Sequence, residues 1–225
     1  MPAEDSSSLN DKELFNTTYT ITALQKAKQK SYITVNLAPE GRLTLPDVVC
    51  ARLKLEVGQN LSKDEFFELK KEEVYYQVKE KAYHLLELRP LTILQLKTKL
   101  KERLYPLKTI NNVIRELKAS GLLNDIEYAT EWIKSQLKRK PQGKRLLLSG
   151  LLKKGLPRSK ATELIAEVYP DKEELKVCQR CLTKLSQLNP QAKPSKILTA
   201  LIRRGFSQAI IQRVWTQFKK NQGRS

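Results

Sequence analysis

A six-residue phrase occurs twice in this sequence, fifty residues apart, and its apolar surroundings repeat with it. Residues 151–156 (LLKKGL) return as residues 201–206 (LIRRGF), with Leu164/Val214 and Ile165/Trp215 in register downstream. A weaker third copy lies fifty-one residues earlier, around Leu96 and Leu100. Self-similarity at a fixed period of this size is typical of stacked helical units that bury their apolar faces against one another. The pattern predicts a mainly α fold built from tandem three-helix repeats.

Capping and helix-breaking residues predict where the repeats begin and end. Residues 62–65 (SKDE) and 92–95 (TILQ) both fit a capping box, which marks a helix start. Arg89-Pro90 ends the first long helix, because proline disfavours helix at the residue before it. The resulting segments are a long helix with the first repeat over 62–123, a second repeat over 124–169, a third over 170–219, and a tail over 220–225.

The segment before the repeats has a different pattern. Residues 19–24 and 32–37 alternate β-branched and aromatic residues, which predicts a hairpin. Residues 43–45 can add a third short strand, and Pro46-Asp47 can open a short helix that Gly58 closes. We therefore expect a small β-hairpin unit with a short helix over residues 19–61, preceded by a disordered lead over residues 1–18.

Two glycines stand where the middle helix of a repeat should end. Gly155 and Gly205 directly follow the last periodic residues, where a left-handed residue turns the chain sharply into the next helix. The first copy has Leu104 at this place. Its turn is therefore expected to differ from the other two or to be strained.

Net positive charge is concentrated in the last two repeats. The chain has 42 Lys and Arg and 24 Asp and Glu, a formal net charge of +18. Residues 1–131 have a net charge of +1, whereas residues 132–225 hold 22 basic and 5 acidic side chains, a net of +17. A basic protein can simply be a soluble one, but such a one-sided distribution favours binding to a polyanion.

Composition restricts where such a chain acts. No run approaches the roughly 18 apolar residues of a membrane span. The first 18 residues are polar and do not match a secretory signal. With 3 Cys and no export signal, the sequence predicts a reduced, cytoplasmic protein.

Motifs for catalysis, metals or cofactors are incomplete in this sequence. The single histidine, His84, cannot build a histidine-based site. Cys178 and Cys181 match C-x-x-C, but no second pair completes a zinc site, so buried packing on a helix is the better interpretation. Residues 150–155 have the glycine spacing of a phosphate loop without its Lys and Ser/Thr. Trp132 and Trp215 could stack on bases, but both lie on apolar stripes. We expect no enzyme, no metal and no cofactor.

Basic residues gather at predicted helix ends and loops of the last two repeats. Lys153-Lys154 and Arg203-Arg204 occupy equivalent positions, so stacked repeats would present them as a ladder. No base-reading pattern is visible, which predicts contact with phosphates of single- or double-stranded DNA that depends on salt and not on sequence. The candidate contacts are Lys138, Arg139, Lys140, Lys144, Arg145, Lys153, Lys154, Arg203 and Arg204.

Taken together, these motifs resemble the RecX family of bacterial regulators of the RecA recombinase. The resemblance rests on residues 121–125 (GLLND) leading into Tyr128-Ala129, on the break at 140–144 (KPQGK), and on the two basic turns at Gly155 and Gly205. It covers residues 19–218, and Leu104 departs from it. It implies a curved helical-repeat module that lies in the groove of the RecA–DNA filament and inhibits ATP hydrolysis and strand exchange.

Two other functions remain compatible with the residues. One is a stand-alone nucleic-acid-binding protein, because three-helix units also build helix-turn-helix readers. The other is a protein-only adaptor with a basic face for an acidic partner. A chain that carries its own repeats needs no second copy to build a core, so we expect a monomer.

Overall fold

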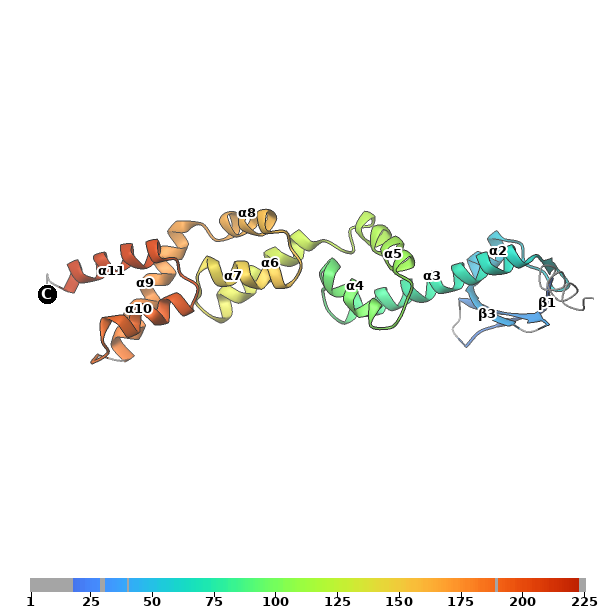
Figure 1. Cartoon of the computed structure of the whole chain (residues 1–225), viewed down its shortest axis with the longest axis horizontal. Helices are drawn as coiled ribbons and strands as arrows, with labels where there is room; N and C mark the ends of the chain where they lie inside the picture. The colour runs from blue at the N-terminus through green and yellow to red at the C-terminus, as the bar shows by residue number, and fades with distance from the viewer. Residues whose placement is uncertain (1–17, 29–30, 40, 189, 223–225) are drawn as a thin grey trace, which may run out of the picture. The chain divides into compact units, whose positions relative to one another are not determined.

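The computed structural model describes residues 18–28, 31–39, 41–188 and 190–222, and its elements are shown in Figure 1. The chain divides into two compact units. The first contains the residues up to Leu85 together with Leu100–Val113, and the second contains Leu86–Lys99 and the residues from Ile114 onward. The predicted disordered lead lies outside the described residues except for its last residue, and the predicted tail lies partly outside them.

The first unit contains a four-stranded antiparallel sheet. The strands β1 (Tyr19–Lys26), β2 (Tyr32–Ala38), β3 (Gly41–Pro46) and β4 (Asn60–Leu61) have the spatial order β3-β2-β1-β4. The predicted hairpin and third strand are confirmed. The fourth strand was not predicted, because two residues are too few to show an alternating pattern.

A short helix, α2 (Asp47–Arg52), follows the sheet as predicted, but Gly58 does not close it. The helix ends at Leu53, and Lys54 after it has a left-handed φ of 48°. Gly58, with φ of 89°, instead turns the chain toward β4 and donates its N–H to the Ile21 carbonyl at 2.8 Å. The prediction failed because a glycine's preference for positive φ does not reveal which turn needs it.

The long helix α3 (Lys63–Leu88) begins at the predicted capping box. The Ser62 amide donates to the Glu65 carboxylate at 2.8 Å, and the Glu65 amide donates to the Ser62 hydroxyl at 3.3 Å. Spacings of three, four and seven residues in the sequence predict a buried stripe through Phe67, Val78 and Ala82. This prediction is wrong at Phe67, which is 44% exposed, whereas its neighbour Phe66 is buried. Further along α3, Glu73 accepts a hydrogen bond from the Thr44 amide of the edge strand β3, which protects that edge from further pairing.

Eight further helices among the described residues form the repeats. Caps predicted from the sequence at Thr92, Asn124 and Ser207 are confirmed. Thr92 and Gln95 form the second capping box, Asn124 accepts from two amides of α6, and the Ser207 hydroxyl accepts from the Ile210 amide of α11. The fold class is thus confirmed as mainly helical with a small N-terminal sheet. The helices are α4 (Ile93–Lys101), α5 (Leu107–Ala119), α6 (Asp125–Arg139), α7 (Lys144–Lys153), α8 (Arg158–Val168), α9 (Asp171–Leu188), α10 (Pro194–Arg203) and α11 (Gln208–Gln222).

The second unit has one continuous apolar core across the second and third repeats. Leu151 and Leu201, which begin the two copies of the repeated phrase, are both fully buried, as is Phe206. Cys178 and Cys181 lie in the same core as free thiols, as their spacing on a helix predicted. Among the described helices, none is both long and apolar enough to cross a membrane.

All three copies of the middle-helix turn have the same left-handed backbone. Gly155 has φ of 94° and Gly205 has φ of 85°, as predicted. Leu104 has φ of 60° and is 92% exposed, so the first turn keeps the shape of the other two and is strained. A left-handed conformation disfavours a residue with a Cβ by about 1–2 kcal/mol.

Replacing Leu104 by glycine is expected to raise the free energy of unfolding by about 1 kcal/mol, because glycine removes the Cβ strain and no packing is lost. Chemical denaturation measures this change. Leu104→Ala is the matched control, since it removes the exposed side chain and keeps the Cβ, and it should leave stability nearly unchanged. Equal effects of the two substitutions would show that the backbone strain is not what matters.

Candidate nucleic-acid interface at the repeat junctions

The first repeat is joined to the second by polar contacts at the start of α4. The Thr92 hydroxyl donates to the Lys154 carbonyl at 2.7 Å, and the Ile93 amide donates to the Asp125 carboxylate at 2.8 Å. The N-terminus of a helix has amides without partners inside the helix. Here a carboxylate of α6 satisfies one of these amides, and the Thr92 hydroxyl ties the helix start to the turn after α7. We call this set of contacts the first junction.

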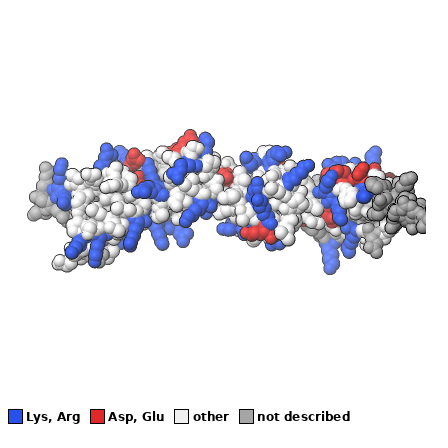
Figure 2. Space-filling model, viewed as in Figure 1, with Lys and Arg blue, Asp and Glu red and all other residues white. Residues whose placement is uncertain are grey.

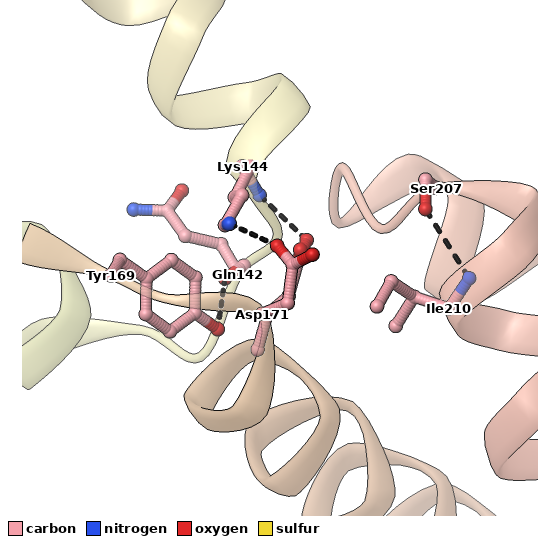
Figure 3. A network of polar contacts seen from close by, with 7 residues as sticks. Gln142, Lys144, Tyr169, Asp171, Ser207 and Ile210 are labelled. Atoms are coloured by element: carbon pink, nitrogen blue, oxygen red, sulfur yellow. Dashed lines mark hydrogen bonds and ion pairs between the residues drawn. The ribbon is translucent and has the colours of Figure 1, made fainter. Parts of the chain in front are cut away.

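The second repeat is joined to the third in the same way at the start of α7, and we call these contacts the second junction. The Lys144 amide donates to the Glu174 carboxylate at 2.9 Å, and the Gly143 and Arg145 amides donate to the carbonyls of Arg204 and Gly205 at 2.8 and 3.1 Å. Figure 3 shows this site, where the Lys144 side chain also pairs with Asp171. The turn that ends one middle helix therefore holds the start of the preceding one.

These junctions give the two turn glycines a second role. A Cβ on Gly155 would lie 2.5 Å from the Leu94 Cβ, and a Cβ on Gly205 would lie 2.5 Å from the Leu146 Cβ. Both glycines are thus required by the close approach of the preceding repeat as well as by their positive φ. Leu104 at the equivalent turn of the first repeat is 92% exposed, so no close neighbour requires a glycine there.

The nine candidate contact residues divide into two groups. Six of them have exposed side chains, whereas Lys144, Lys154 and Arg204 are half-buried. Within each of the two equivalent basic pairs, the first residue faces solvent and the second lies against the protein. The exposed residues are Lys138, Arg139, Lys140, Arg145, Lys153 and Arg203.

Two of the half-buried residues, Lys154 and Lys144, already contact other side chains of the fold. The Lys154 ammonium lies 5.3 Å from the ring centroid of Tyr128 and 5.4 Å from that of Trp132, and it donates to the Tyr128 hydroxyl at 3.0 Å. Cation–π contacts of this kind stabilise by roughly 0.5–2 kcal/mol. Lys144 neutralises Asp171, and its hydrogen bond lowers the pKa of that carboxyl. These residues stabilise the junctions and are less available to a ligand.

The second junction brings together basic residues that are sixty positions apart in the sequence. Backbone bonds at Gly143 and Arg145 place the start of α7 directly against the turn at Arg204-Gly205. The equivalent turn at Lys153-Lys154 lies instead against the start of α4, where Leu94 stands. We refer to Lys140, Lys144, Arg145, Arg203 and Arg204 as the junction cluster.

Acidic side chains near the candidate site are largely engaged with partners. Glu163 pairs with Lys160 at 3.3 Å, and Glu173 pairs with Lys176 at 2.7 Å. Glu174 is buried, and this burial raises the pKa of its carboxyl. Figure 2 accordingly shows many Lys and Arg side chains and few acidic ones over the part of the view that holds α6–α11 in Figure 1. The exposed basic residues therefore remain able to attract a polyanion.

The other residues that the sequence offered as functional candidates lie in the apolar core or on a helix surface. Trp132 and Trp215 pack partly buried against the core, as their apolar stripes predicted. Burial raises the pKa of the Cys178 thiol to about 12, which makes it a poor nucleophile. His84 is an exposed residue of α3. Within the described ranges, no three His, Cys, Asp or Glu side chains gather as a metal site.

Sequence reasoning missed the residues that hold the junctions. Asp125 and Glu174 lie in the first turns of α6 and α9, where an acid normally indicates favourable charge at its own helix start. Both instead cap the middle helix of the preceding repeat. Tyr169, which is buried and donates its hydroxyl to the Gln142 carbonyl at 3.2 Å, was also missed. The common placement of an acid near the start of successive repeats was the available signal.

Known proteins with a similar sequence share one name. A "Regulatory protein RecX" of Pelodictyon phaeoclathratiforme is 31% identical over 122 residues, which cover 52% of this chain and 74% of that protein. Another of the same name, from Listeria monocytogenes serotype 4a, is 25% identical over 201 residues, covering 88% of this chain and 74% of the relative. No family model matches the chain.

Two solved structures share the fold. A crystal structure of a regulatory protein RecX superposes with a TM-score of 0.74 at 16% identity, covering 88% of this chain and 99% of the other. The crystal structure of RecX from Lactobacillus salivarius gives 0.61 at 21% identity, covering 65% and 97%. The fold and the junctions thus define a protein built from tandem three-helix repeats. The chain belongs to the RecX family.

Proposed function

We propose that this protein binds the RecA–DNA filament and inhibits the ATP hydrolysis and strand exchange of the recombinase, acting in DNA repair and recombination. The observation that carries the proposal is the concentration of exposed basic side chains on the last two repeats, where most nearby acids are paired or buried. Membership of the RecX family suggests the recombinase as the partner. The exposed basic surface supports electrostatic contact with a polyanion.

The physical case rests on charge and repetition. A filament groove floored by DNA phosphates is a polyanion, and each Lys or Arg that neutralises a phosphate releases counterions. Tandem repeats let one molecule contact several neighbouring filament subunits, so that weak contacts reinforce one another through effective concentration. Such a role needs binding and no bond-making chemistry. It fits a cytoplasmic monomer whose repeats, over 62–123, 124–169 and 170–219, act together.

The residues proposed as contacts follow from their exposure. Lys138, Arg139, Lys140, Arg145, Lys153 and Arg203 contact phosphate or acidic groups of the filament. Lys144 pairs with Asp171 across the second junction, and Lys154 lies over the rings of Tyr128 and Trp132 in its own repeat. Arg204 is half-buried, and its Nη1 atom has no hydrogen-bond partner among the described residues.

The ATPase rate of RecA on single-stranded DNA, titrated with this protein at fixed salt, tests the proposal. We expect suppression at well below one molecule per RecA subunit, because a filament binder blocks several subunits at once. A competitor for DNA would need enough protein to cover the strand. An unchanged rate at all ratios would reject the proposed function.

The same exposed basic residues also favour a second candidate, a stand-alone nucleic-acid-binding protein. This candidate differs from the filament binder in its expected DNA affinity, which would be the same with and without the recombinase. A protein-only adaptor is the third candidate, and it would bind RecA equally well after removal of the DNA.

A further inference from the structure

The exposed side of α10 carries a hollow of about 620 Å³ that the sequence did not predict. Three of its lining residues are basic, two carry hydroxyl groups, and none of those described is acidic. A concave surface with this lining attracts an anion, since cations and hydroxyls can both donate hydrogen bonds to it. The lining residues are Ser195, Lys196, Thr199, Ala200, Arg203 and Arg204.

In the second repeat, aromatic side chains occupy the corresponding region. The Trp132 ring contacts α7 at Gly150, where an added Cβ would lie 2.3 Å from a ring carbon. The Lys154 ammonium then lies over this ring and over Tyr128. The cation at the end of α7 thus has partners within its own repeat.

Matching the two repeats shows what changes in the third. Ala129 and Ile133 in α6 and Cys178 and Leu182 in α9 are the fully buried pairs, four residues apart, of the two first helices. The residue before Ile133 is Trp132, and the residue before Leu182 is Cys181. A thiol therefore replaces the indole, while Ala200 replaces Gly150 and Arg204 replaces Lys154.

Arg204 lacks the partners that Lys154 has. Burial raises the pKa of the Cys181 thiol, and the charge of Arg204 opposes this shift, which places the guanidinium close to α9. Its Nη1 atom is buried and has no hydrogen-bond partner among the described residues. A buried donor without an acceptor is unfavourable by about 1–3 kcal/mol, and more when it is charged. An acceptor from a ligand would remove this penalty.

We propose that the hollow on α10 binds the phosphodiester backbone of a nucleic-acid strand. Lys196 and Arg203 contact successive phosphates, Arg204 contributes its unused donor, and Ser195 adds a hydroxyl donor. This inference rests on the proposed function and deepens it, because it makes the third repeat the main DNA contact. It also adds Lys196, which no sequence pattern indicated.

The dimensions of the hollow favour a strand over a single anion. Its lining extends from Ser195 to Arg204, about 13 Å along a helix with a rise of 1.5 Å per residue. One phosphate group could contact only part of this length. Arg145 of α7 adjoins the same turn through its hydrogen bond to Gly205, so the positive surface continues across the second junction.

A Lys196→Gln/Arg203→Gln variant of the full chain tests the charges. Its affinity for a fluorescent single-stranded oligonucleotide, measured by anisotropy without recombinase, is expected to fall at least tenfold. The slope of log affinity against log salt is expected to become shallower by about 1.4, since each phosphate contact contributes about 0.7 for single strands. Lys160→Gln/Lys176→Gln is the control with equal charge loss on α8 and α9, and both lysines there are paired with glutamates.

A Thr199→Trp variant tests the hollow without changing charge. Thr199 is exposed, and its hydroxyl bonds to the carbonyl four residues earlier at 2.9 Å, as does Thr216 on α11. Thr216→Trp is therefore a control of the same chemistry on another helix. We expect the α10 substitution to weaken DNA binding severalfold and the α11 substitution to leave it unchanged.

Three results would overturn the inference. They are unchanged affinity of the Lys196/Arg203 variant, equal effects of the two threonine variants, and saturable binding of inorganic phosphate with no effect of any variant on DNA. The recombinase ATPase assay is read separately on the same proteins. If the wild-type protein fails to suppress ATPase while the α10 variants lose DNA affinity, the proposed function fails and the α10 site stands.

Discussion

The Gly143→Ala variant is expected to lose about 3 kcal/mol of unfolding free energy in the second unit. Gly143 has an ordinary φ of −88°, so the effect does not come from backbone strain. An added Cβ would lie 2.3 Å from the Gly205 carbonyl oxygen and 2.4 Å from the Phe206 amide nitrogen. Both are backbone atoms that cannot move aside, so one methyl group should open the second junction. Chemical denaturation measures the loss, and hydrogen exchange should show it in α10 and α11.

Substitutions at two other glycines distinguish the steric clash of an added Cβ from the strain of a positive φ. Gly121 has φ of 76° and nothing within 4 Å of an added Cβ, so Gly121→Ala should lose only the roughly 1 kcal/mol of a left-handed residue. Gly205 has both the positive φ and a close neighbour, so Gly205→Ala should exceed either single effect. If Gly143→Ala is no more destabilising than Gly121→Ala, the second junction does not hold the repeats together.

Reversing the charge of exposed members of the junction cluster is expected to reduce DNA affinity about 100-fold or more at low salt. The substitutions are Lys140→Glu, Arg145→Glu and Arg203→Glu in one chain. Each removes a phosphate contact and adds a repulsion. Because all three side chains are exposed, the thermal midpoint should stay unchanged. Anisotropy with labelled DNA at several salt concentrations measures the affinity.

The matched control places the same three reversals elsewhere in the second unit. Lys160, Lys172 and Lys176 are exposed on α8 and α9 and lie outside the candidate contacts. Their replacement by glutamate changes the net charge equally, so it shows how much of the loss is a general field effect. Equal losses in the two triple variants would mean that the junction cluster is not a specific contact surface.

The helical repeats could be predicted from the sequence because local signals agreed with one another. The capping residues at Ser62, Thr92 and Asn124 stand directly before the periodic apolar residues they introduce. Turn glycines at Gly155 and Gly205 close the middle helices. Such signals act over one or two helical turns and are therefore visible in a single chain.

The features that could not be predicted depend on contacts between distant residues. The burial of Glu174 and the hollow on α10 arise from how one repeat fits the next. The choice between Lys153 and Lys154 as the exposed residue of their pair depends on Tyr128 and Trp132 in another helix. The turn at Gly58 and the two-residue strand β4 could not be predicted for the same reason, because hydrogen bonds to β1 determine both.

The most direct test of the account is the affinity of this protein for three targets at one fixed salt concentration. The targets are RecA filaments on single-stranded DNA, the same DNA alone, and RecA alone. We predict that the filament binds most tightly, because it offers phosphates and protein surfaces together along repeating sites. An affinity for bare DNA equal to that for the filament would contradict filament recognition and leave a general nucleic-acid-binding protein.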